Sequence, residues 1–95
     1  MAVGDVVSGL FTGVNTWHSF QPAASVEICI TSTLGARDGE MNTAITNGTI
    51  YGESRNALNT NFQHTVNTKV MINNTNYLAI KFDGAEGSYA GIQIK

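Results

Sequence analysis

The chain has 95 residues, enough for one domain with one hydrophobic core. Charged residues make up only 13% of it, against roughly 25% in ordinary soluble domains. The net charge is −2 and the five Lys and Arg residues are scattered, which excludes the clustered phosphate contacts that nucleic-acid binding requires. No apolar stretch approaches the length of a membrane span, and the first residues lack the pattern of a signal peptide, so we expect a protein made in the cytoplasm without membrane contact.

Three strands are predicted in the N-terminal third, over residues 3–11, 16–20 and 25–32. The second is halted at Pro22, because proline cannot donate to a sheet ladder. In the third, one face carries Val26, Ile28 and Ile30, and the other face includes Cys29. Apolar residues on both faces predict a central position for this strand, and a glycine-containing loop over residues 34–40 is expected to follow it.

The middle of the chain contains a predicted hairpin over residues 43–51. Asn47 and Gly48 together favour a type I′ turn, which needs positive φ angles at both of its central residues. Residues 53–65 are ambiguous, because Leu58 and Phe62 are four apart as on a helix face while three asparagines disfavour a helix. We expect a long loop or an irregular strand there, followed by a strand over residues 68–72.

The last twenty residues predict two strands, 76–82 and 88–95, joined by a glycine-containing turn. Leu78, Ile80 and Phe82 alternate with more polar residues and predict one buried face. In all, seven to eight short strands with turns every 8–12 residues indicate an all-β fold, a small antiparallel β-sandwich or jelly-roll-like domain that occupies residues 1–95.

Candidate catalytic residues are few. The single cysteine, Cys29, excludes an intramolecular disulfide, and paired with His18 or His64 it could act as a nucleophile with its base. No third orienting group is identifiable, and Cys29 falls within a strand, so we interpret it as a buried structural residue. The sequence therefore predicts a protein that is not an enzyme and uses no cofactor.

Metal-ligand patterns are also weak. His18 and His64 are far apart and have no neighbouring ligands at short spacing, although a trimer could bring three copies of one histidine to its axis. The loop carboxylates lack the regular spacing of a calcium loop. We therefore expect no metal site and interpret these acidic residues as solvated; they are Asp38, Glu40, Asp83 and Glu86.

The polar composition leaves two interpretations open. Asn, Thr, Ser and Gly together supply 37 of the 95 residues. This composition fits a Thr-rich sheet surface in water, and it equally fits a surface that faces other subunits, where charge is costly to bury. If subunits do pack together, the candidate contact residues are Trp17, Phe20, Tyr77 and Tyr89, each of which could instead belong to the core of its own domain.

Residues 15–32, together with residues 76–80 and 89–95, show a short aromatic run, a Gln-Pro break, an alternating strand and a closing Gly-Ile-Gln-Ile-Lys segment. In these features the chain resembles small structural proteins of tailed bacteriophages, over about a third of its length, and the resemblance does not extend to residues 34–65. The resemblance implies a virion or tail-associated β-sandwich that works as an oligomer and has no catalytic residues.

We therefore expect a non-enzymatic structural protein that assembles into a symmetric homo-oligomer, with a trimer or ring among the arrangements open to it, in a phage virion. Other virion proteins are further candidate partners. The alternative is a carbohydrate- or surface-binding β-sandwich module, which the aromatic residues and the loop asparagines favour.

Overall fold

The computed structural model describes residues 2–13, 16–35, 40–57, 64–82 and 86–95, with the backbone alone at residues 40, 54–57 and 64–68. Over these ranges the chain forms eight strands and no helix, so no helix that could span a membrane is found in them. The strands are β1 (Val6–Thr12), β2 (His18–Phe20), β3 (Ile28–Gly35), β4 (Glu40–Thr46), β5 (Tyr51–Ala57), β6 (His64–Ile72), β7 (Tyr77–Phe82) and β8 (Glu86–Gln93).

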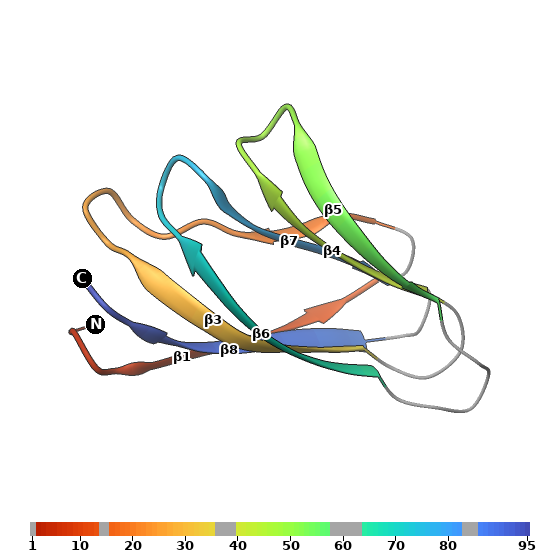
Figure 1. The fold of residues 1–95 in the computed structure, drawn as a ribbon, viewed down its shortest axis with the longest axis horizontal. Helices are drawn as coiled ribbons and strands as arrows, with labels where there is room; N and C mark the ends of the chain where they lie inside the picture. The colour runs from red at the N-terminus through yellow and green to blue at the C-terminus, as the bar shows by residue number, and fades with distance from the viewer. Residues whose placement is uncertain (1, 14–15, 36–39, 58–63, 83–85) are drawn as a thin grey trace.

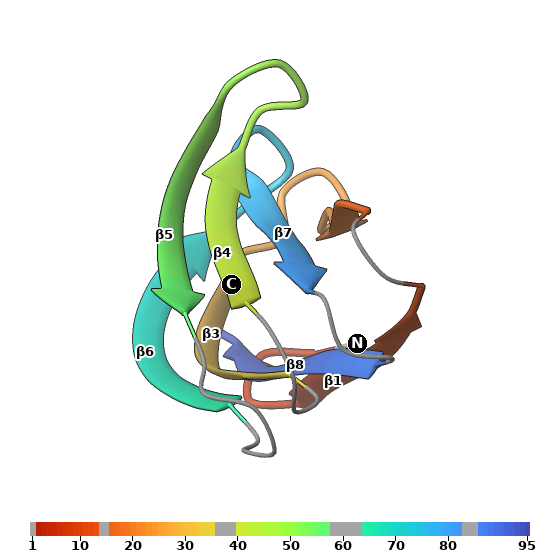
Figure 2. The ribbon, with the colours of Figure 1, turned by 90° about the vertical axis from the view of Figure 1, so that its right-hand side faces the viewer.

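The strands pair as a long antiparallel ribbon that has been rolled up. The first strand pairs with the eighth, the second with the seventh, the third with the sixth and the fourth with the fifth. Pairing of β3 with β8 and of β4 with β7 then joins the ribbon into two sheets. Sheet A has the order β1-β8-β3-β6 and sheet B the order β2-β7-β4-β5, and the two form the layers seen in Figures 1 and 2. This strand order is that of a jelly roll, which confirms the predicted fold class.

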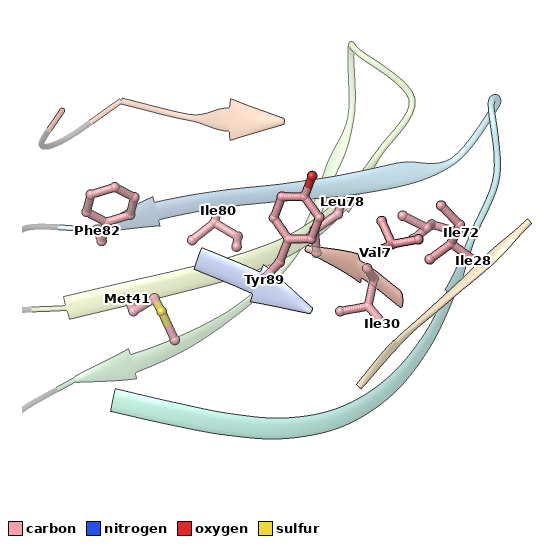
Figure 3. Packing of buried hydrophobic residues seen from close by; sticks show 9 residues of the cluster. All are labelled: Val7, Ile28, Ile30, Met41, Ile72, Leu78, Ile80, Phe82 and Tyr89. Carbon is pink, nitrogen blue, oxygen red and sulfur yellow. The ribbon is translucent and has the colours of Figure 1, made fainter. Parts of the chain in front are cut away.

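The core lies between the sheets, where apolar side chains from the two inner faces meet (Figure 3). The alternation predicted for β7 is confirmed, since Leu78, Ile80 and Phe82 are 0%, 0% and 1% exposed. In sheet A, Ile28 and Ile30 of β3 are fully buried, and β3 has a neighbour on both sides, as its apolar residues predicted. The other buried apolar members of this cluster are Val7, Met41, Ile72 and Tyr89.

Beyond Ile30, a β-bulge reverses the faces of β3. Between Ile30 and Ser32 the strand advances two residues while β8 advances one, from Gly91 to Ala90, so β3 holds one extra residue relative to β8. Relative to β6 the extra residue lies on β6, between Val70 and Asn67. Thr33 is consequently buried, and its hydroxyl lies 3.5 Å from that of Thr43 across the sandwich. The strand continues to Gly35, three residues past the end predicted for it.

Two predictions for the middle of the chain were wrong. Residues 51–57 form a regular strand, β5, at the edge of sheet B, although a loop or irregular strand was expected from residue 53 on; Leu58 and Phe62 lie outside the described residues. The β4–β5 hairpin exists, but Thr46 pairs with Tyr51, so the loop has four residues instead of two. Gly48 has a φ of 95°, while Asn47 is not among the residues with positive φ, so the turn is not type I′.

Asparagine side chains organise the two loops that connect β4 to β5 and β6 to β7. In each loop the first residue, Asn47 or Asn73, accepts hydrogen bonds on its Oδ1 from the amides two and three residues later, at distances of 2.8–2.9 Å. Such Asx turns satisfy backbone donors that would otherwise have no partner. They provide a stable four-residue connection without the positive φ at asparagine that a type I′ turn requires.

Aromatic rings fill the side of the sandwich between β1, β2, β7 and β8. Phe82, His18, Phe11, Tyr89 and Phe20 follow one another in ring contact, with centroid separations between 4.7 and 5.4 Å. Two glycines of sheet A leave room for these rings. A Cβ atom at Gly9 would lie 2.6 Å from the Tyr89 ring, and one at Gly87 would lie 2.6 Å from the Phe82 ring.

Candidate functional site

The two outer faces of the sandwich differ in how they expose apolar side chains. Among the described residues, six exposed large apolar side chains lie on the outer face of sheet A, on its strands or directly after β8. Of the exposed large apolar side chains that the structure describes, one lies on a strand of sheet B, that of Tyr51. The six are Val6, Leu10, Leu34, Met71, Ile92 and Ile94. Sheet A therefore presents the apolar surface of this domain.

A continuous row of four apolar side chains crosses the outer face of sheet A from edge to edge. Val6 pairs with Ile92, Ile92 with Cys29, and Cys29 with Met71, so one residue from each strand falls in register. Val6 is 79% exposed, Met71 61% and Ile92 43%, while Cys29 is half-buried between its neighbours. We call these four residues the apolar row.

Charged groups flank the apolar row on opposite sides. Lys69 precedes Met71 by two positions on β6 and is exposed. Glu27 precedes Cys29 by two positions, and its carboxylate lies 3.8 Å from the Lys95 ammonium. Because β3 and β6 are antiparallel, these two positions lie on opposite sides of the row. The row itself carries no charge.

The outer face of sheet B is covered by its own aromatic side chains. The rings of Trp17 and Tyr51 stack with centroids 4.8 Å apart, and the Lys81 ammonium lies 5.9 Å from the Trp17 ring centroid. Trp17 directly precedes β2 and Tyr51 begins β5, so the stack joins the two edges of the sheet. Ala44 and Ala79, which pair on the two central strands, are 2% and 0% exposed although they point outward. We attribute their burial to the rings above them, and we call this group the aromatic clasp.

Polar groups border the aromatic clasp. The Asn42 amide donates to the Glu53 carboxylate at 3.2 Å, and both side chains lie on the same outer face. Tyr77, on β7, is half-buried on this face as well. Exposed aromatic rings beside hydrogen-bonding groups are the elements from which sugar-binding surfaces are built.

The four predicted contact residues divide between surface and interior. Trp17 and Tyr77 lie half-buried on the outer face of sheet B. Tyr89 is 8% exposed within the core, and Phe20 is half-buried with its ring stacked on Tyr89 at 4.7 Å. Burial raises the pKa of the Tyr89 phenol above its ordinary value. Tyr89 therefore belongs to the interior of its own domain.

The candidate catalytic residues are not brought together. Cys29 lies on the outer face of sheet A, whereas the His18 ring lies inside, stacked between Phe11 and Phe82, and its Nε2 donates to the Gly13 carbonyl at 2.9 Å. His64 starts β6 opposite Gly35, at the far end of β3 from Cys29. The described residues contain no cluster of three or more metal-ligating side chains.

Two of the four predicted loop carboxylates lie at strand ends instead. Glu40 begins β4 and Glu86 begins β8. Asp38 and Asp83 lie outside the described residues.

The fold assigns this chain to the class of jelly-roll β-sandwiches. No protein-family model, curated protein or solved structure matches the chain. What the domain does must therefore be inferred from its own surfaces, of which the apolar row and the aromatic clasp are the two most distinctive.

Proposed function

We propose that this protein is a non-enzymatic structural subunit that assembles with copies of itself into a symmetric homo-oligomer, and that the assembly is a component of a phage virion. The observation that supports this best is the apolar row with the exposed leucines around it. These side chains stay in water although the domain has a complete core of its own. Exposed apolar patches of roughly 300–600 Å² on soluble domains commonly mark interaction sites.

The low charge of the chain also supports assembly. Interface centres are depleted in charged residues, and charged residues make up only 13% of this sequence. The virion assignment has separate support, namely the resemblance of residues 15–32, 76–80 and 89–95 to small structural proteins of tailed phages. A jelly roll is compatible with that assignment, because viral capsid domains use the same architecture.

The test of assembly is the solution mass of the purified chain, measured by light scattering after size-exclusion chromatography over about a hundredfold range of concentration. A stable multiple of 10.1 kDa is expected. A monomer at every concentration would contradict self-assembly. For the virion assignment, peptides of this chain should be found by mass spectrometry in purified particles, and their absence from particles whose other proteins are detected would count against it.

A second candidate function is carbohydrate binding, and the aromatic clasp is the observation that favours it. Tyr51 is 38% exposed, and the clasp is bordered by the Asn42–Glu53 pair. A sugar ring could stack on the exposed tyrosine face while its hydroxyls meet the polar border. Glycan-array binding that is lost in Tyr51→Ala and kept in Met71→Lys would support this function, and an array without hits would remove it.

A further inference from the structure

We propose that the apolar row packs against the same row of a second copy, face to face, about a two-fold axis that runs along the row. The assembly is then a closed dimer with four sheet layers. This inference rests on the proposed function and specifies its partner and geometry. Three observations support it: the size of the face, the flanking charges and the asymmetry between the two outer faces.

The face is large enough for a stable contact. Four strands about 4.8 Å apart and seven to nine residues long give a face about 19 Å wide and about 25 Å long. Because side chains protrude from the sheet, the accessible surface area of such a face exceeds its flat dimensions. That area is of the order of the roughly 800 Å² that one partner contributes to a standard interface. Twisted sheets pack well on one another at a small angle, so a second copy provides a partner of matching width and shape.

The flanking charges favour a two-fold axis along the row. Such an axis exchanges the two sides of the row, so it brings Lys69 of the second copy to the side that holds Glu27. The two positions are on neighbouring strands, β6 and β3, so in the dimer Lys69 of each copy can share the Glu27 carboxylate of the other copy with Lys95, at two equivalent places. No charged residue of the described chain lies in the row itself, so closing the contact buries no unpaired charge at its centre.

The asymmetry of the two outer faces limits the assembly to two copies. A face that packs on the same face of a second copy makes an isologous contact, and that contact leaves no part of the face for a third copy. Further growth would need a second adhesive face, and the outer face of sheet B is already covered by the aromatic clasp and bordered by polar side chains. The geometry therefore points to a dimer of about 20 kDa, twice the 10.1 kDa chain, instead of a trimer or ring.

Surface substitutions with solution mass as the readout test this dimer. Met71→Lys introduces charge at a residue that is 61% exposed in one copy, so the fold should survive while dimer affinity falls roughly tenfold or more. Lys69→Glu should weaken the dimer through repulsion from Glu27, and adding Glu27→Lys should restore much of the affinity. The matched control is Thr75→Lys, at an exposed position in the β6–β7 loop, which should dimerise like the native chain. Circular dichroism establishes that each variant is folded.

The single cysteine provides a second, independent readout. Cys29 is in the middle of the apolar row, so a thiol reagent should modify it several-fold more slowly at concentrations where the protein is dimeric than at concentrations where it is monomeric. In Met71→Lys the rate should be fast at every concentration. A thiol rate that does not change with concentration, in a protein whose mass does, would overturn this placement of the interface.

The outcomes separate this inference from the proposed function. The result that supports both the inference and the proposed function is a dimer that Met71→Lys dissociates and Lys69→Glu weakens. In that case the double substitution Lys69→Glu with Glu27→Lys restores much of the dimer affinity. If the protein forms a trimer or a ring, or a dimer that these substitutions do not weaken, this interface geometry is wrong, while the proposal of self-assembly remains supported. A monomer at all concentrations overturns both, and binding of the face to a different virion protein would then be the remaining use of the row.

Discussion

Gly87→Ala should destabilise the domain, although the backbone at Gly87 does not require glycine. Its φ is not in the positive range, so alanine can adopt the same conformation. The obstacle is the Phe82 ring from the opposite sheet, since a Cβ at position 87 would lie 2.6 Å from its Cε1 and 2.8 Å from its Cδ1. Carbon atoms in contact prefer about 3.5–4.0 Å, so the ring would have to move by about 1 Å.

The magnitude follows from how little room Phe82 has. The residue is 1% exposed and its ring is stacked on His18 at 5.2 Å, so the displacement must spread through the aromatic contacts. Overpacking of this kind costs about 1–3 kcal/mol of folding stability. Alanine recovers roughly 0.5–1 kcal/mol, because it loses less backbone conformational entropy on folding than glycine does. A net loss of about 1–2 kcal/mol is expected, which lowers Tm by roughly 5–15 °C in a domain of this size.

Urea and thermal unfolding followed by circular dichroism measure this loss, at one fixed protein concentration because association also shifts Tm. The matched control is Gly52→Ala in β5, where the nearest atom to an added Cβ is a carbonyl oxygen at 3.7 Å, so stability should be unchanged or slightly raised. On a Phe82→Leu background, Gly87→Ala should cost much less. If Gly87→Ala is as stable as Gly52→Ala, the proposed contact between Gly87 and Phe82 is wrong.

Three further substitutions test the other structural features. Trp17→Ala removes the stack on Tyr51 and should cost about 1–3 kcal/mol in urea unfolding, while Trp17→Phe should retain most of that stability. Because burial raises the pKa of Tyr89, the folded chain holds this proton to higher pH than the unfolded chain, so stability should fall above about pH 10. Unfolding free energies measured from pH 8 to 11 should show a smaller fall in Tyr89→Phe. Asn73→Ala removes the acceptor of two loop amides and should cost about 0.5–2 kcal/mol by thermal unfolding, whereas Asn76→Ala, which keeps both amides, should cost less.

Much of the fold could be predicted because hydrophobic alternation is a local signal. The pattern over residues 77–82 identified the buried face of β7 correctly, and the two-sided apolar character at Cys29 identified β3 as a central strand. The end of β3 could not be predicted, because a bulge relative to β8 changes which residues face inward, and a single extra residue leaves no mark in composition. The regular pairing of β5 beyond residue 52, where a loop or an irregular strand is predicted, was not foreseen because glycine and polar residues have low strand propensity, which pairing with β4 overrides.

The candidate sites were harder to predict because they depend on register between distant strands. The apolar row takes one residue from each of four strands, and only the pairing of Val6 with Ile92, of Ile92 with Cys29 and of Cys29 with Met71 brings them into line. The sequence marks Trp17 as a candidate subunit contact, and its stack on Tyr51 across the sheet depends on the sheet order, which composition does not reveal. Tyr89 is predicted as a candidate contact or a core residue, and the absence of a side chain at Gly9 leaves space for its ring within the core.

Rolling a ribbon so that its first strand pairs with its last has a consequence for synthesis on the ribosome. The hairpin of β4 and β5 can form as soon as it emerges, whereas β1 must wait for β8, which follows the other seven strands of this domain in the sequence. Until then β1 is without its sheet partner, and Val7, which folding buries, remains exposed beside Val6 and Leu10, so the nascent chain is at its most prone to aggregate. Stalled nascent chains that end before β8 should accordingly remain sensitive to protease at β1, and protection there would indicate a different order of assembly.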